Sequence, residues 1–243
     1  MLGLLITGTD TGVGKTFMTC WLARKLRDEG YRVGACKPVC SGAVFDARRN
    51  AWTWPDVDAL SDALDFRFPQ EQICPQMFRA PLAPSAAARL ESSRVDMRRI
   101  REGVDAWSSL VEMLLIEGVG GWQCPLTERE TVADLASVLG FPVLVVSPHR
   151  LGTINHTLLT VESIQRSGLA LAGIVMNQMS ASPDETAATN IDEIRRFTSV
   201  PILGTLPYQA PLELRRDQPL ASIVWGNFIR ETNQASRSGP GSN

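Results

Sequence analysis

The sequence of 243 residues is poor in the side chains on which many metal and disulfide proteins depend. It contains two histidines, His149 and His156, so a histidine-rich transition-metal centre is not expected. Its five cysteines are odd in number, and no two of them form a Cys-x-x-Cys pair. This pattern argues against a disulfide framework and against a zinc site. Reduced thiols are therefore expected.

Long apolar runs and an excess of positive charge are absent as well. No apolar stretch approaches the roughly 20 residues that cross a bilayer, and the chain does not open with the basic and then apolar segments of an export signal. Lys and Arg number 24 against 26 Asp and Glu, which offers no sequence-independent grip on nucleic acid. We therefore expect a cytoplasmic protein with no nucleic-acid partner and no membrane partner.

The most informative segment that is present is GTDTGVGKT, at residues 8–16. It follows the apolar run Leu2–Ile6 and leads into residues 17–26, whose apolar and basic residues recur at helical spacing, so it occupies a strand–turn–helix context. Its glycines allow backbone N–H groups to face an anion, Lys15 adds a charge for β/γ-phosphates, and Thr16 can ligate Mg²⁺. Gly8 lies one residue earlier than in the usual phosphate-binding loop. The alternative is a glycine-rich turn with a solvated lysine.

Apolar segments that alternate with helical patterns predict the fold class. Six predicted strands begin at Leu2, Tyr31, Val111, Pro142, Leu171 and Pro201. This alternation is typical of a P-loop NTPase-like α/β fold, with a mostly parallel central sheet and helices on both faces. We expect one domain over residues 1–225. A short closing helix over Ser222–Arg230 and a disordered tail over Thr232–Asn243 are expected to follow.

Polar residues follow several of these strands and should share one edge of the sheet. Lys37 and Asn177 each follow a predicted strand, and an exposed loop lysine is the alternative for Lys37. Glu117 ends a buried strand, where a carboxylate can reach a Mg²⁺ or can simply be solvated. Asp56 and Asp58 open a short helical segment and are either helix-start acids or metal ligands. Whether the tryptophans of the surrounding 43–84 stretch cover the site or pack elsewhere is left open.

With these segments assembled, the sequence resembles the dethiobiotin synthetase family over residues 1 to about 225. The resemblance rests on GTDTGVGKT, KPVCSG, PDVDAL, EGVGGW, LGTINHTLLT and GTLPY. It implies ATP- and Mg²⁺-dependent conversion of 7,8-diaminopelargonic acid and CO₂ to dethiobiotin, ADP and phosphate. A carbamate and a carbamic-phosphoric mixed anhydride are the implied intermediates.

The family motifs also imply roles for individual residues. The implied catalytic residues are Lys37, Lys15, Thr11 and Ser41, of which Thr11, Lys37 and Ser41 also hold the substrate. The implied metal ligands are Thr16, Asp58 and Glu117, with Asp58 rather than Asp56 at the position that matches the family. The implied nucleotide-binding residues are Gly12, Val13, Gly14, Lys15, Thr16, Phe17, Glu117, Gly118, Val119, Gly120, Asn177, Gln178, Pro207, Tyr208 and Gln209.

The resemblance further implies a homodimer with its substrate site at the subunit interface. The distal carboxylate of the substrate would be bound across the boundary by Leu151, Gly152, Thr153, Ile154 and Asn155, at the start of a helix. Gly12 stands where some members carry an acid, so no side chain can act there. His149 and Arg150 stand where other members carry a lysine or another residue.

Two other classes of ATPase share the expected sheet and loop. Switch ATPases of the ParA and MinD type carry a second lysine early in the loop, where this chain has Asp10. They also tend to bear a basic surface or a terminal amphipathic helix, and neither is apparent. A cobyrinic acid amidase would add a glutaminase domain, for which 243 residues are too few.

Overall fold

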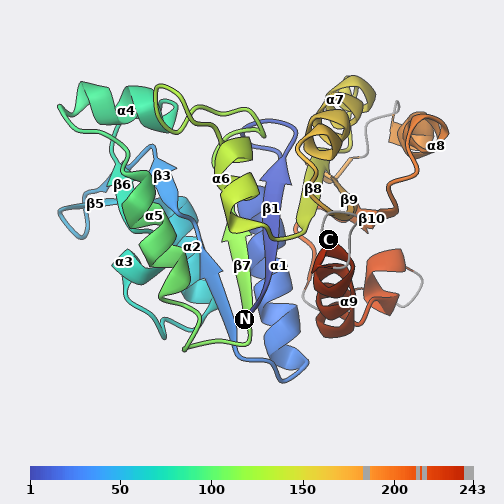
Figure 1. Cartoon of the computed structure of the whole chain (residues 1–243), viewed down its shortest axis with the longest axis horizontal. Coiled ribbons are helices and arrows are strands. Elements are labelled where there is room, and N and C mark those ends of the chain that lie inside the picture. The colour runs from blue at the N-terminus through green and yellow to red at the C-terminus, as the bar shows by residue number, and fades with distance from the viewer. Residues whose placement is uncertain (183–186, 212–213, 215–217, 238–243) are drawn as a thin grey trace.

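The computed structural model of the protein describes residues 1–182, 187–211, 214 and 218–237. Its centre is a parallel six-stranded sheet in the order β10-β9-β8-β1-β7-β2 (Figure 1). The strands are β1 (Leu2–Gly8), β2 (Val33–Cys36), β7 (Met113–Glu117), β8 (Val143–Pro148), β9 (Leu171–Asn177) and β10 (Ile202–Leu206). The predicted fold class is therefore confirmed.

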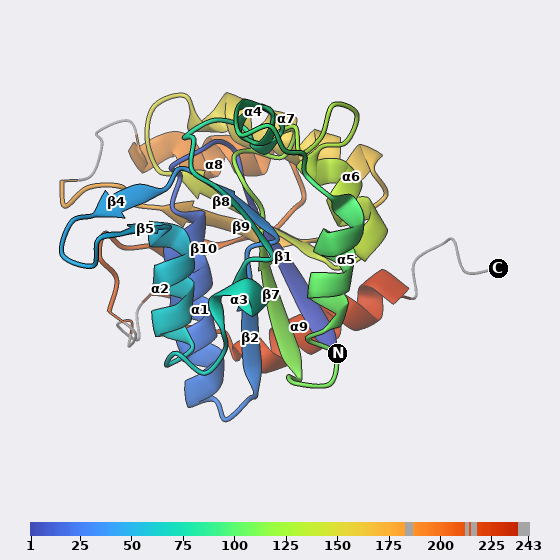
Figure 2. The same ribbon diagram turned by 90° about the vertical axis from the view of Figure 1, so that its left-hand side faces the viewer.

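Helices cover both faces of this sheet, which explains why the central strands are continuous apolar runs. Two of the covering helices lie on one face and two on the other (Figure 2): α1 (Lys15–Asp28) and α2 (Pro55–Ala63), against α5 (Met97–Asp105) and α6 (Val132–Leu139). Three more complete the layers: α7 (Thr153–Arg166) on β8 and β9, α8 (Ala187–Phe197) on α7, and α9 (Trp225–Arg237) on β1 and α1. All five residues of β7 are buried.

The parallel register brings the ends of the inner strands to a common edge. Ile6 of β1 lies opposite Glu117 of β7, and Gly8 lies opposite Val146 of β8. Pro148 of β8 lies opposite Asn177 of β9. The loops that follow these strands therefore emerge side by side, as expected for the ligand-binding edge of an open α/β sheet.

The chain between β2 and α5 contains four short strands that the sequence pattern does not predict, beside the expected helices at 57–64 and 85–90. It contains the two-stranded parallel sheet β3 (Val39–Ser41) with β6 (Gln76–Phe78) and the antiparallel hairpin β4 (Val44–Asp46) with β5 (Ala51–Thr53). The helices α3 (Gln70–Ile73) and α4 (Pro84–Leu90) complete it. Each of its strands has three residues, too few for an alternating pattern to be recognised.

The C-terminal part corrects the predicted start of the tail. Helix α9 continues to Arg237, so residues 232–237 are helical rather than disordered. The Asn233 side chain is buried, donates to the Gly3 carbonyl at 2.8 Å and accepts from the Gly3 amide at 3.3 Å, which fastens the helix to β1. The rest of the predicted tail, residues 238–243, lies outside the described residues. No helix among the described residues is long and apolar enough to cross a membrane.

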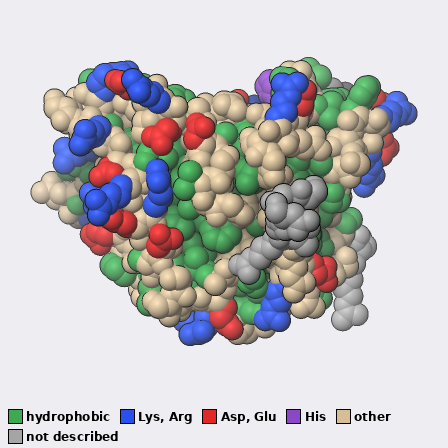
Figure 3. Space-filling model, in the orientation of Figure 1, with side chains coloured by type: hydrophobic (Ala, Val, Ile, Leu, Met, Phe, Trp, Pro, Cys, Tyr) green, Lys and Arg blue, Asp and Glu red, His purple; other side chains and the backbone are tan. Residues whose placement is uncertain are grey.

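The outer surface carries charges of both signs. On the face turned to the viewer in Figure 3, Lys and Arg side chains are interspersed with Asp and Glu side chains. This mixing accords with the formal net charge of −2. No area of a single sign dominates that face.

Candidate active site

A cleft of about 590 Å³ opens at the carboxyl edge of the sheet. It brings together several residues that the sequence places in separate motifs, among them Thr11, Lys15, Thr16, Lys37 and Ser41. The other lining residues are Gly12, Gly14, Gly42, Asp56, Pro81, Leu82, Ala83, Pro84, Val119, Gly120 and Cys124. Lys15 and Lys37 therefore face one cavity.

The loop between β1 and α1 requires glycine at two positions. Gly12 and Gly14 have φ angles of 71° and 96°, in the left-handed region that other residues avoid. A Cβ on Gly14 would lie 2.0 Å from Nδ2 of Asn177. That same Nδ2 donates to the Val13 carbonyl at 3.0 Å, so the end of β9 packs directly against the loop.

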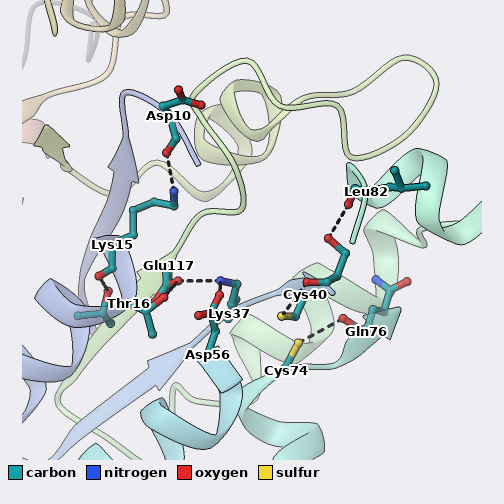
Figure 4. A network of polar contacts seen from close by, with 12 residues as sticks. Asp10, Lys15, Thr16, Lys37, Cys40, Asp56, Cys74, Gln76, Leu82 and Glu117 are labelled. Carbon is teal, nitrogen blue, oxygen red and sulfur yellow. Dashed lines mark hydrogen bonds and ion pairs between the residues drawn. The ribbon is translucent and has the colours of Figure 1, made fainter. Parts of the chain in front are cut away.

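Lys15 is buried at the start of α1, and no carboxylate of the described ranges forms an ion pair with it. Lys15 is only 6% exposed, and its Nζ donates to the backbone carbonyl of Asp10, within the loop, at 2.9 Å (Figure 4). Burial outweighs the attraction of Glu117 and, with repulsion from Lys37, lowers the pKa of Lys15 to about 8. An anion in the cleft would relieve this unfavourable environment.

Lys37 has the opposite surroundings. Its Nζ donates to Glu117 Oε1 at 2.8 Å and pairs with Asp56, and Thr16 Oγ1 donates to the same Glu117 oxygen at 2.7 Å (Figure 4). Burial alone would lower the pKa of Lys37, but the carboxylates of Glu117 and Asp56 outweigh burial and raise it above its ordinary value. Lys37 is therefore held as a cation at a fixed place, not exposed in a loop as the alternative interpretation had it.

The acid that the structure brings into this network is Asp56, whereas the motif led us to expect Asp58. Asp56 lines the cleft and pairs with Lys37, whereas Asp58 does neither. Two residues along a helix project roughly 200° apart, so the two carboxylates cannot face the same cleft. Burial would raise the pKa of Asp56, but Lys37 and the Thr16 hydroxyl outweigh burial and lower it, which keeps the carboxylate ionised.

The oxygen atoms of this network have the character of a magnesium site. Glu117 Oε2 is buried and has no hydrogen-bond partner in the described structure. Together with the Thr16 hydroxyl and the Asp56 carboxylate it provides hard oxygen donors, which Mg²⁺ prefers. No group of three or more His, Cys, Asp or Glu residues suited to a metal is found in the described ranges. A small donor set suits a cation that keeps water and phosphate ligands.

The segment predicted to bind the substrate carboxylate lies away from this cleft. None of residues 151–155 lines it. Asn155 is exposed and Leu151 is 75% exposed. Thr153 is buried and its hydroxyl bonds to the Ser147 hydroxyl at 2.7 Å, so its side chain is committed to the interior. Gly152 has a φ of 86° and begins α7.

The predicted base-binding segments form a second concavity. Gln178 and Pro207 line a pocket of about 390 Å³ beside the ends of β9 and β10. The Gln178 amide donates to the Leu206 carbonyl at 2.9 Å, which holds the two segments together. Tyr208 is 43% exposed, and Gln209 has a φ of 49°. Phe17, although predicted at the nucleotide, does not line the main cleft.

Sequence reasoning missed part of the cleft wall. Residues 81–84 line it, and the Leu82 carbonyl accepts a hydrogen bond of 2.6 Å from the Ser41 hydroxyl. The prolines in this segment indicate a turn, but they do not indicate that the turn lines the cleft. Cys124 also lines the cleft, and a Cβ on Gly120 would lie 2.7 Å from its sulfur. All five cysteines are free, as expected.

A family model and several known proteins match most of the length of the chain. A family model described as an AAA domain matches residues 2–216. The chain is 46% identical over 224 residues to the ATP-dependent dethiobiotin synthetase BioD of Anaeromyxobacter dehalogenans strain 2CP-1, covering 92% of this chain and 97% of that protein. It is 41% identical over 209 residues to the protein of the same description from Bacillus subtilis strain 168, covering 85% and 87%.

A solved structure supports the fold. The septum site-determining protein MinD from Pyrococcus horikoshii OT3, complexed with Mg-ADP, superimposes with a TM-score of 0.51 at 18% identity. The match covers 96% of this chain and 95% of that one. At this identity the likeness speaks for the shared architecture alone.

Proposed function

The chain belongs to the dethiobiotin synthetase family, and from this membership we propose that it makes dethiobiotin from 7,8-diaminopelargonic acid, CO₂ and ATP, releasing ADP and phosphate. The observation that carries the proposal is the cleft itself. It contains the phosphate-loop lysine Lys15 and the separately held Lys37, which is bracketed by Glu117 and Asp56. Two cations in one cavity suit a reaction in which negative charge builds up on a transferred phosphoryl group.

The nucleotide would bind along the loop. The backbone amides of residues 12–16 and the N-terminus of α1 would cradle the phosphates, with Lys15 supplying a full charge. Thr16, Asp56 and Glu117 would hold Mg²⁺, which when bound neutralises phosphate charge. Val119 and Gly120, with the neighbouring residues Glu117 and Gly118, would border the phosphates. Asn177, Gln178 and residues 207–209 would contact the base.

The reacting end of the substrate would lie between Thr11, Lys37 and Ser41. One amine of the diamine combines with CO₂ to give a carbamate, with loss of a proton. A carbamate oxygen then attacks the γ-phosphorus and ADP leaves. The second amine attacks the carbonyl carbon of the mixed anhydride, phosphate leaves, and the nitrogen loses a proton as the ring closes. Lys37 would stabilise the charge on the carbamate and the phosphoryl group, and orientation of the two amines would lower the barrier to closure.

A homodimer is part of this proposal. Residues 151–155 do not line the cleft of their own chain, so a second copy would have to supply them to the bound substrate. The positive dipole end at the start of α7 suits a carboxylate, although the Thr153 amide itself donates to the Arg150 carbonyl at 3.2 Å. The cytoplasm is the proposed location.

The test measures ADP release and dethiobiotin formation while diaminopelargonic acid, bicarbonate, ATP and Mg²⁺ are omitted in turn. Turnover should require all four. ATP hydrolysis that continues unchanged without the diamine would contradict the proposal and would favour a nucleotide-switch ATPase.

A further inference from the structure

Trp54 occupies a position that the proposed chemistry does not use. It is the residue before α2, and its carbonyl accepts the hydrogen bond from the Asp58 amide at 2.9 Å that begins the helix. Its side chain is not a polar cap. Instead, the indole Nε1 donates to the Phe78 carbonyl at 2.9 Å. Asp56, which faces the cleft, is two residues further along.

The acceptor of this hydrogen bond belongs to a well-fixed strand. Phe78 ends β6 and lies opposite Ser41 of β3, another residue of the cleft. In the same strand the Gln76 side chain accepts from the Asp96 amide and donates to the Asp96 carbonyl, both at 2.8 Å. The indole of Trp54 therefore fastens the start of α2 to a strand that is itself clamped to α5.

Other attachments of α2 hold its opposite end. Arg24 pairs with Asp62, and Arg27 donates to the Ala63 carbonyl at 2.6 Å. The hairpin before Trp54 lies at the surface, where Trp52 is 42% exposed and packs on Phe45 and on the Arg79 guanidinium. At the start of α2, Asp56 is held by its ion pair with Lys37 and by the Thr16 hydroxyl, and the indole hydrogen bond joins the buried Val57 in fixing the helix itself.

We propose that Trp54 is a positioning residue that sets the place of the Asp56 carboxylate relative to Glu117, and thereby the strength with which a divalent cation is held beside the nucleotide. The inference rests on the proposed function, which assigns both carboxylates to the cation. Groups that orient metal ligands commonly change metal affinity by about tenfold or more when they are removed. Because the indole contributes only one neutral hydrogen bond, we expect a loss of metal affinity near the lower end of that range.

The experiment compares Trp54→Phe with Trp52→Phe, the same substitution two residues away on the exposed hairpin. Binding of Mn²⁺ to the ADP complex is followed by electron paramagnetic resonance, and binding of ADP alone is measured in the presence of EDTA. Trp54→Phe should weaken Mn²⁺ binding about five- to tenfold while ADP affinity in EDTA changes less than twofold. Trp52→Phe should leave both affinities unchanged.

Equal Mn²⁺ affinities in the two variants would overturn the inference. So would a loss of ADP affinity in EDTA as large as the loss of Mn²⁺ affinity, because the indole would then support the whole cleft. If Trp54→Phe folds poorly, Gln76→Met tests the same idea. It loosens β6, the strand that accepts the indole hydrogen bond, without changing Trp54, and it should also lower the affinity for Mn²⁺. No diamine is present, so failure to form dethiobiotin would count against the proposed function and leave this comparison intact.

Discussion

Replacing Lys15 by methionine should stabilise the protein when no nucleotide is bound. Methionine keeps most of the length of the side chain and removes its charge. In the ligand-free cleft that charge is buried and repelled by Lys37, and its hydrogen bond goes to a neutral carbonyl, that of Asp10. Most single substitutions destabilise a protein, so a gain in stability is a distinctive outcome.

The magnitude follows from the lowered pKa. The pKa of Lys15 falls from 10.5 to about 8 in the folded protein, and a difference of about 2.5 pH units corresponds to roughly 3 kcal/mol of disfavoured charge. The lost hydrogen bond to the Asp10 carbonyl offsets about 1.5 kcal/mol of this. We expect the free energy of unfolding of Lys15→Met to exceed that of the wild type by about 1–2 kcal/mol at pH 7.

The difference should also depend on pH in a defined direction. Between pH 8 and 10.5 the unfolded chain holds the Lys15 proton more tightly than the folded one, so this residue makes wild-type stability rise with pH across that window. The advantage of Lys15→Met should therefore shrink as pH increases. Urea unfolding at several pH values measures both effects, with Lys25→Met on the same helix as the control. A variant less stable than the wild type at pH 7, or an advantage that does not change with pH, would refute the reasoning.

Three further predictions concern other residues of the site. Lys37→Met should lower the free energy of unfolding by about 3 kcal/mol, because it leaves Glu117 and Asp56 without their cation; Mg²⁺ should restore part of it in urea unfolding. Asp56→Asn should lower the rate of ADP release about a hundredfold, the upper end of the loss seen when groups that support a metal site are removed, whereas Asp58→Asn should change that rate less than about threefold. Asn155→Ala should raise the KM for the diamine more than the KM for ATP; equal changes in steady-state assays would argue against the carboxylate site.

The sheet could be predicted because its strands are covered on both faces. Burial on both sides makes β1, β7, β8 and β9 continuous apolar runs, and parallel pairing then places their polar ends on one edge without further information. Glu117, Lys37 and the phosphate loop were brought together by this argument alone. The helical end of α9 could not be predicted in this way, because its polar sequence resembles a disordered tail. Only the contact of Asn233 with Gly3 shows why this segment stays helical.

The choice between Asp56 and Asp58 could not be made from the sequence for a different reason. Both acids lie in the first turn of α2, where either is favoured by the helix dipole. Which of them faces the cleft depends on the rotation of the helix about its axis. That rotation follows from the face of α2 that packs in the core, with Val57 and Leu60 buried, together with the hydrogen bond from the Trp54 indole to the Phe78 carbonyl, 24 positions away. A local motif therefore narrows the choice to two residues, and a tertiary contact decides it.

The two lysines of the cleft illustrate how one cavity can give the same side chain two electrostatic roles. Lys37 is neutralised by two carboxylates that are fixed by the fold, so its position and charge are set before any ligand arrives. Lys15 has no such partner among the described residues and would gain one when an anion enters the loop. The buried charge of Lys15 therefore lowers the stability of the ligand-free protein, and nucleotide binding would remove that cost. Lys37, which is proposed to act on the carbamate, is already held in place as a cation before any ligand binds. If phosphate binding did not stabilise the wild type more than Lys15→Met, this division of roles between the two lysines would not hold.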